Sequence, residues 1–125
     1  MDGKARDIAR ILNAVSEGCI FDERPMIMAE AVRGKQQLRE YMANFFAAFP
    51  ELTLTVTNLI ATERQAWVEW RAEGVNQGKF LNMAPTHQRV TFRGASVCEV
   101  REGKIVHERR YWDAQNLVQQ LRDGR

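Results

Sequence analysis

Residues 89–112, which read RVTFRGASVCEVREGKIVHERRYW, decide the fold. Residues 89–101 have a strand pattern that would span roughly 40 Å if fully extended. Glu102-Gly103 predicts a tight turn, and residues 104–112 then return as the next strand. A strand as long as 89–101 usually bends, and we expect the bend or bulge at Gly94.

The strand pattern continues upstream of this hairpin. Apolar and polar residues alternate over residues 52–57 and again over residues 66–75, as is typical of half-buried strands. A loop with Gly78 and Pro85 follows at residues 76–88. Because no crossover helix is predicted between residues 52 and 112, these strands should pair as an antiparallel meander.

Three other segments have helical periodicity. The first is a helix from about residue 4 to residue 16, which Gly18 would end, followed by a short strand at residues 19–21 that Pro25 ends. The second begins after Gly34 and ends at Pro50, and its apolar stripe comprises Leu38, Tyr41, Met42, Phe45, Phe46 and Phe49. That stripe is typical of core packing, although in a hollow domain it could also line a ligand. The third helix begins at about Ala114.

Composition indicates one globular domain over residues 1–125. The chain is 45% hydrophobic and carries a formal net charge of +2, a balance too even for bulk recognition of nucleic acid. No long uncharged apolar run predicts a membrane span or an N-terminal signal peptide. Cys19 and Cys98 lie far apart and show no metal-ligand spacing, so we expect a reducing, cytoplasmic environment.

The predicted architecture is therefore α+β. A long, curved antiparallel sheet packed on helices would enclose a cone-shaped hollow, which is a natural site for a small molecule.

Three stretches of the sequence carry a family resemblance. Residues 32–35 open the helix that ends at residues 47–50, and residues 78–81 lead through 85–86 into 90–94. Residues 103–106 precede Tyr111-Trp112-Asp113, with Leu117 and Gln120-Leu121 beyond. Together they resemble the SnoaL-like polyketide cyclase group of the nuclear-transport-factor-2-like superfamily, which has a cystatin-like fold. The long first helix usual in that group has no counterpart here, so the closure of the cone is an open question, and a dimer partner could supply it.

This resemblance implies a cofactor-independent cyclase or isomerase that binds a small, carbonyl-bearing apolar molecule. An acid/base carboxylate would catalyse an aldol-type ring closure. The resemblance places that carboxylate at Asp113, with further polar pocket residues near Glu99 and Glu23. The implied reaction needs no cofactor, and no metal is expected because His87 and His107 fit no zinc spacing.

Each of these residues also has a simpler interpretation. Asp113 could cap the last helix, Glu99 could form a surface ion pair, and Glu23 could be solvated. The expected substrate-binding residues are Trp70, Tyr111, Arg109, Phe21 and Phe46. Alternation places Arg109, Tyr111 and Asp113 on one face, where Arg109 could orient Asp113 or belong to a charged outer face.

Two other functions stay open at this point. The chain could be a non-catalytic ligand-binding or dimerisation module, or an epoxide-hydrolase-like enzyme that uses an arginine beside a carboxylate. We also expect a homodimer through the outer face of the sheet, where alternation would place Trp67 and Trp112. Cys98 is expected to face inward as a small core residue.

Overall fold

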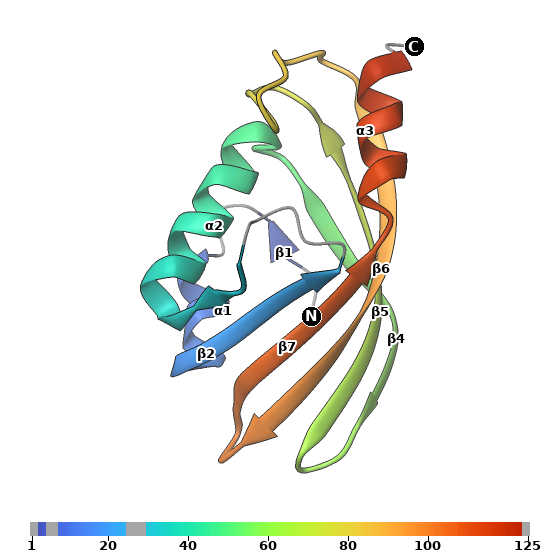
Figure 1. Ribbon diagram of the computed structural model, residues 1–125. Coiled ribbons are helices and arrows are strands. Elements are labelled where there is room, and N and C mark those ends of the chain that lie inside the picture. The colour runs from blue at the N-terminus through green and yellow to red at the C-terminus, as the bar shows by residue number, and fades with distance from the viewer. Residues whose placement is uncertain (1–2, 5–7, 25–29, 124–125) are drawn as a thin grey trace.

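The computed structural model describes residues 3–4, 8–24 and 30–123. Its strands are β1 Gly3–Lys4, β2 Val15–Arg24, β3 Val32–Arg33, β4 Thr53–Ala61, β5 Gln65–Val75, β6 Arg89–Arg101 and β7 Lys104–Trp112. Its helices are α1 Ile8–Asn13, α2 Gly34–Ala48 and α3 Ala114–Asp123. All seven strands form one curved sheet in the order β1-β4-β5-β6-β7-β2-β3 (Figure 1). The predicted α+β architecture is confirmed.

The meander from β4 to β7 is antiparallel, as the short connections predict. β2 differs, because it joins the far side of β7 in parallel. The sheet is therefore mixed rather than wholly antiparallel. A parallel pair is possible here because the long segment between β2 and β7 provides the crossover connection that it requires.

The N-terminal segment differs most from its prediction. Of the helix expected over residues 4–16, only α1 is helical among the described residues, and Val15 already begins β2. Gly18 lies inside β2 rather than ending a helix, and Pro25 lies outside the described residues. Pairing of β2 with β7 satisfies the backbone of this segment and overrides its local helical periodicity.

Gly94 does not mark a bulge. The register of β6 is regular through Gly94 with both neighbouring strands, and the irregularity against β7 lies between Glu99 and Val100. A Cβ atom at Gly94 would lie 2.3 Å from Cζ2 of Trp70 and 2.7 Å from the carbonyl oxygen of Tyr111. Glycine is needed here because the Trp70 ring crosses directly over the strand.

We call the side of the sheet that packs against the helices the inner face, and the opposite side the outer face. The larger core cluster joins this inner face to α2 and α3, and includes Phe49, Phe92 and Leu117. The smaller cluster packs α1 and α2 against β2. In Figure 1 the hairpin ends of β4–β7 extend below both α2 and α3.

The predicted orientation of β7 is wrong. Trp112 is 7% exposed and faces inward, whereas Tyr111 is 46% exposed on the outer face. Alternation alone fixed only that the two residues are on opposite faces. Pairing decides the rest, because Gly94 joins Trp70 and Trp112 in one register row and so places both rings on the inner face.

Candidate functional site

A buried carboxylate lies on the inner face, on strand β2. Strand alternation turns Phe21 and Glu23 inward from β2, and Glu23 is only 5% exposed. Its Oε2 atom accepts a hydrogen bond from the Tyr41 hydroxyl at 2.7 Å and another from Nε1 of Trp112 at 2.8 Å. The simpler interpretation of Glu23 as a solvated residue is therefore wrong.

The surroundings of Glu23 change its acidity. Burial raises the pKa of Glu23 above its usual value, although the Tyr41 and Trp112 hydrogen bonds and the Arg110 charge lower it. Burial likewise raises the pKa of Tyr41 well above its usual value, so its hydroxyl stays a donor. A desolvated carboxyl group of raised pKa is the kind of group that enzymes use for proton transfer near neutral pH.

Arg110 lies beside this carboxylate and belongs to a second polar group. Its Nε and Nη2 atoms lie 3.0 and 2.9 Å from Oε2 of Glu108. The Ser96 hydroxyl donates to the same oxygen at 2.9 Å, and Nε1 of Trp70 donates to Ser96 at 3.2 Å. The inner face thus holds one raised-pKa carboxyl group and one arginine that is already ion-paired.

Aromatic rings surround this polar centre. Phe21 lies 5.2 Å from Tyr41 between ring centroids, and Trp112 lies 5.2 Å from Phe92. Phe46 is partly buried and packs against both core clusters. Of the substrate-binding residues expected from the sequence, Phe21 and Trp70 lie on the inner face, where both contact the Arg110 guanidinium, and Phe46 packs from α2 against both core clusters.

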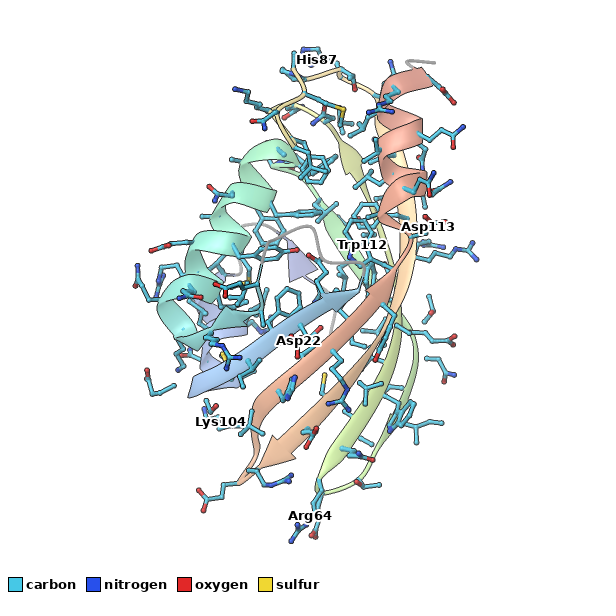
Figure 2. The ribbon with its side chains drawn as sticks, viewed as in Figure 1. Asp22, Arg64, His87, Lys104, Trp112 and Asp113 are labelled. Carbon is cyan, nitrogen blue, oxygen red and sulfur yellow. The ribbon has the colours of Figure 1, made fainter. Side chains whose placement is uncertain are left out.

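Asp113 has a different environment. It is exposed at the start of α3 (Figure 2), and its Oδ1 accepts a hydrogen bond from the backbone N–H of Asn116 at 2.9 Å. This is the geometry of a helix N-cap. The acid/base role that the family resemblance gives to Asp113 stays a prediction.

The two roles of Asp113 predict different mutant behaviour. Asparagine caps a helix about as well as aspartate, so Asp113→Asn should keep both stability and activity, whereas Asp113→Ala should cost ~0.5–2 kcal/mol of unfolding free energy. Urea unfolding of both variants measures this difference. Loss of activity in a folded Asp113→Asn protein would return the acid/base role to Asp113.

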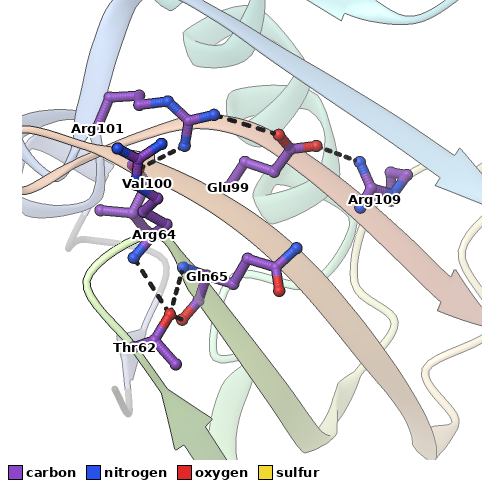
Figure 3. A network of polar contacts seen from close by, with 7 residues as sticks. All are labelled: Thr62, Arg64, Gln65, Glu99, Val100, Arg101 and Arg109. Atoms are coloured by element: carbon purple, nitrogen blue, oxygen red, sulfur yellow. Dashed lines mark hydrogen bonds and ion pairs between the residues drawn. The ribbon is translucent and has the colours of Figure 1, made fainter.

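Glu99, Arg109 and Tyr111 lie on the outer face. Glu99 accepts a hydrogen bond from Nη1 of Arg109 at 2.8 Å and lies 3.9 Å from Nη2 of Arg101 (Figure 3). The hydrogen bond from Arg109 holds the pKa of Glu99 below its usual value. Glu99 is therefore a surface ion-pair residue here, and neither Arg109 nor Tyr111 lines the inner face as predicted.

His107 and Cys98 lie on opposite faces of the sheet. His107 pairs with Asp22 at 2.6 Å between Nε2 and Oδ2, also on the outer face (Asp22 is labelled in Figure 2). Cys98 is 4% exposed on the inner face, as predicted. Burial raises the pKa of its thiol to about 12, so it is not a nucleophile at neutral pH.

Three further observations on the described residues concern metal ligands, membrane-spanning helices and a surface depression. Within residues 3–4, 8–24 and 30–123, no three His, Cys, Asp or Glu side chains are grouped as metal ligands. No helix in that part of the chain is long and apolar enough to cross a bilayer. A shallow depression lies at the tips of the β4–β5 and β6–β7 hairpins, remote from Glu23, and is lined by Thr62, Glu63, Arg64, Val100, Arg101, Glu102 and Gly103.

Sequence reasoning missed Tyr41, Trp112 and Glu108 as site residues, and it favoured a charged outer face for Arg110. Tyr41 was part of the aromatic stripe predicted for α2, where nothing distinguishes a ligand-facing ring from a packed one. Glu108 and Arg110 alternate with Trp112 along β7. That spacing is a usable signal, since it places two opposite charges and an indole on one face of a strand.

Sequence comparison identifies the family of the chain. A sequence profile of the SnoaL-like polyketide cyclases matches residues 4–121. The chain belongs to the SnoaL-like polyketide cyclase family. No protein of curated function matches this SnoaL-like chain significantly.

Solved structures share the SnoaL-like fold. A protein from Jannaschia sp. CCS1 assigned as a SnoaL-like polyketide cyclase superposes with a TM-score of 0.81 at 21% identity, covering 91% of this chain and 77% of that one. A protein from Acidithiobacillus ferrooxidans assigned as a polyketide cyclase has a TM-score of 0.83 at 16% identity, covering 98% and 87%. AclR from Streptomyces galilaeus, assigned as a hydroxylase, has a TM-score of 0.77 at 21% identity, covering 93% and 71%. At these identities the likeness shows the fold alone.

Proposed function

We propose that this SnoaL-like protein is a cofactor-independent cyclase or isomerase in which Glu23 transfers the proton. The observation that carries the proposal is the carboxyl group of Glu23, which is buried among aromatic rings and hydrogen-bonded by Tyr41 and Trp112. The substrate would be a small carbonyl compound with an apolar body, because such a molecule matches the aromatic surroundings.

The proposed reaction needs no external oxidant or reductant. The ionised Glu23 removes a proton from a carbon flanked by carbonyl groups, which leaves an enolate. The enolate carbon attacks a second carbonyl carbon of the same molecule, a C–C bond forms, and the carbonyl electrons move to its oxygen. The protonated Glu23 then returns its proton to that alkoxide. Tyr41 and Trp112 stabilise the ionised form through their hydrogen bonds to Oε2.

Deuterium exchange into simple carbonyl compounds tests this proposal and does not require the natural substrate. Cyclic and linear β-dicarbonyl compounds are incubated with the protein in D2O, and exchange of the C–H between the carbonyl groups is followed by NMR. We expect exchange that depends on Glu23 and not on Asp113. If no compound exchanges faster with protein than without it, while one of them binds, the chain is a binding module rather than an enzyme.

A second candidate function is epoxide hydrolysis, because Arg110 is the register partner of Glu23 and forms an ion pair with Glu108. One carboxylate would take a proton from water, the resulting hydroxide would attack an epoxide carbon and break its C–O bond, and the protonated carboxyl group would return its proton to the ring oxygen. Incubation with styrene oxide and detection of the diol distinguishes this candidate from proton exchange at a β-dicarbonyl.

We further propose a homodimer through the outer face. Ile60 and Trp67 are register partners there, 64% and 54% exposed, and Tyr111 is 46% exposed on the same face. Trp67→Lys should convert a dimer to a monomer in sedimentation velocity at micromolar concentration, since it places a charge in an apolar contact. Leu59→Lys is the matched control, because Leu59 is 57% exposed but faces inward beside Val68. A monomeric wild-type protein would contradict the proposal.

A further inference from the structure

Arg110 lies beside the buried carboxyl group of Glu23 on the inner face of the sheet. It is the register partner of Glu23 across the β2–β7 pair and of Ser96 across the β6–β7 pair. The Arg110 side chain is 28% exposed, whereas Glu23 as a residue is 5% exposed. The Arg110 side chain is therefore partly exposed on the inner face, directly beside a buried carboxyl group.

The surrounding residues hold the guanidinium in place. Its Cζ atom lies 4.8 Å from the ring centroid of Phe21 and 5.3 Å from that of Trp70. Glu108 contacts Nε and Nη2 with a single oxygen, and the same oxygen accepts the Ser96 hydroxyl. The third nitrogen, Nη1, takes no part in this ion pair. A planar, prepositioned guanidinium of this kind suits recognition of an oxygen anion.

We infer that Arg110 binds a negatively charged oxygen of the ligand, and that the ligand class is an aromatic or apolar carbonyl compound bearing a carboxylate or an acidic enol. This inference rests on the proposed function and assigns proton transfer and anion binding to two different residues. Glu23 moves the proton, and Arg110 holds the oxygen on which negative charge resides or develops. Glu108 is a positioning residue, because it fixes Arg110 but competes with the ligand anion for it.

Isothermal titration calorimetry with two stable probes tests the inference. 2-Naphthoate carries the anion, and 2-acetylnaphthalene has the same ring system with a neutral carbonyl group. One charge-assisted hydrogen bond corresponds to about a 10–100-fold preference for naphthoate in Kd. Arg110→Met should abolish that preference. Arg109→Met should retain it, because Arg109 forms the equivalent ion pair with Glu99 on the outer face.

A second variant pair keeps the test decisive if Arg110→Met does not fold. Glu108→Gln removes the competing negative charge and should tighten naphthoate binding several-fold, which a purely structural role of Arg110 would not produce. Glu99→Gln removes the matched outer-face carboxylate and should leave naphthoate binding unchanged.

The outcomes separate this inference from the proposed function. Equal affinity of the wild-type protein for both probes overturns the anion-binding role, even when β-dicarbonyl exchange still depends on Glu23. Conversely, naphthoate preference that requires Arg110 supports the binding role even if Glu23→Gln exchanges deuterium at the wild-type rate, a result that removes only the proposed function.

Discussion

Glu23→Gln is expected to lower the proton-exchange rate ~10²–10⁴-fold, which is the usual size of a general acid/base contribution. Glutamine has nearly the same shape, and its amide oxygen can still accept the hydrogen bonds that Tyr41 and Trp112 donate to Oε2 of Glu23. The loss would therefore come from the missing proton acceptor rather than from a rearranged core. NMR exchange rates on the most reactive β-dicarbonyl compound measure it.

The pH dependence provides an independent check. Because the pKa of Glu23 is raised by burial, the exchange rate should fall on acidification at a pH above the usual range for glutamate. Tyr41→Phe removes one hydrogen bond to the ionised form, so it should move this acidic limb to still higher pH. A limb at the ordinary glutamate value, or exchange by Glu23→Gln at the wild-type rate, would contradict the assignment.

Glu23→Gln should also stabilise the folded protein at neutral pH. A carboxyl group whose pKa is raised in the folded state contributes stability that is present below its unfolded pKa and is lost as the pH rises through its folded pKa. Glu23→Gln removes that loss, so above the raised pKa its unfolding free energy should exceed that of the wild type by ~0.5–2 kcal/mol. Urea unfolding at acidic and neutral pH should show the gain only at neutral pH.

Gly94→Ala adds only one methyl group, but it should clearly lower the free energy of unfolding. The added Cβ would lie 2.3 Å from Cζ2 of Trp70, so the ring must move or the strands must separate. Overpacking of this kind costs about 1–3 kcal/mol. Moving the ring would also break the hydrogen bond from Trp70 to Ser96. The Ser96 hydroxyl, which donates to Glu108, would then no longer be held in place. Denaturant unfolding and near-ultraviolet circular dichroism report the two effects.

Gly18→Ala is the matched control, because Gly18 also lies within a strand but has open space where its Cβ would be. It should be neutral or slightly stabilising, since alanine lowers the entropy of the unfolded chain. In a Trp70→Phe background, Gly94→Ala should cost less than in the wild type, because the clashing ring is smaller. Equal stability of Gly94→Ala and the wild type would show that the Trp70 ring has room to move.

Local pattern was sufficient for most of the architecture. The aromatic stripe of α2, the alternation of β5 and the Glu102-Gly103 turn each specify an element through nearest-neighbour chemistry, and all three are confirmed. β2 was underestimated because its stability comes from pairing with β7, a strand more than 80 positions later in sequence, counted from Ile20 to His107. No window of local sequence contains that partner.

The candidate site was only partly accessible to sequence reasoning. The sequence by itself determined which aromatic residues and carboxylates are available to form a site. It also determined that Tyr111 and Trp112 lie on opposite faces of the sheet. Only the tertiary structure decided which of the two faces is buried, since alternation has a period but no absolute phase. The register row through Gly94 sets that phase, turning Trp112 toward Glu23 and leaving Asp113 as an exposed cap. The acidity of Glu23 was decided in the same way, because desolvation is a property of the packed neighbours and not of the residue.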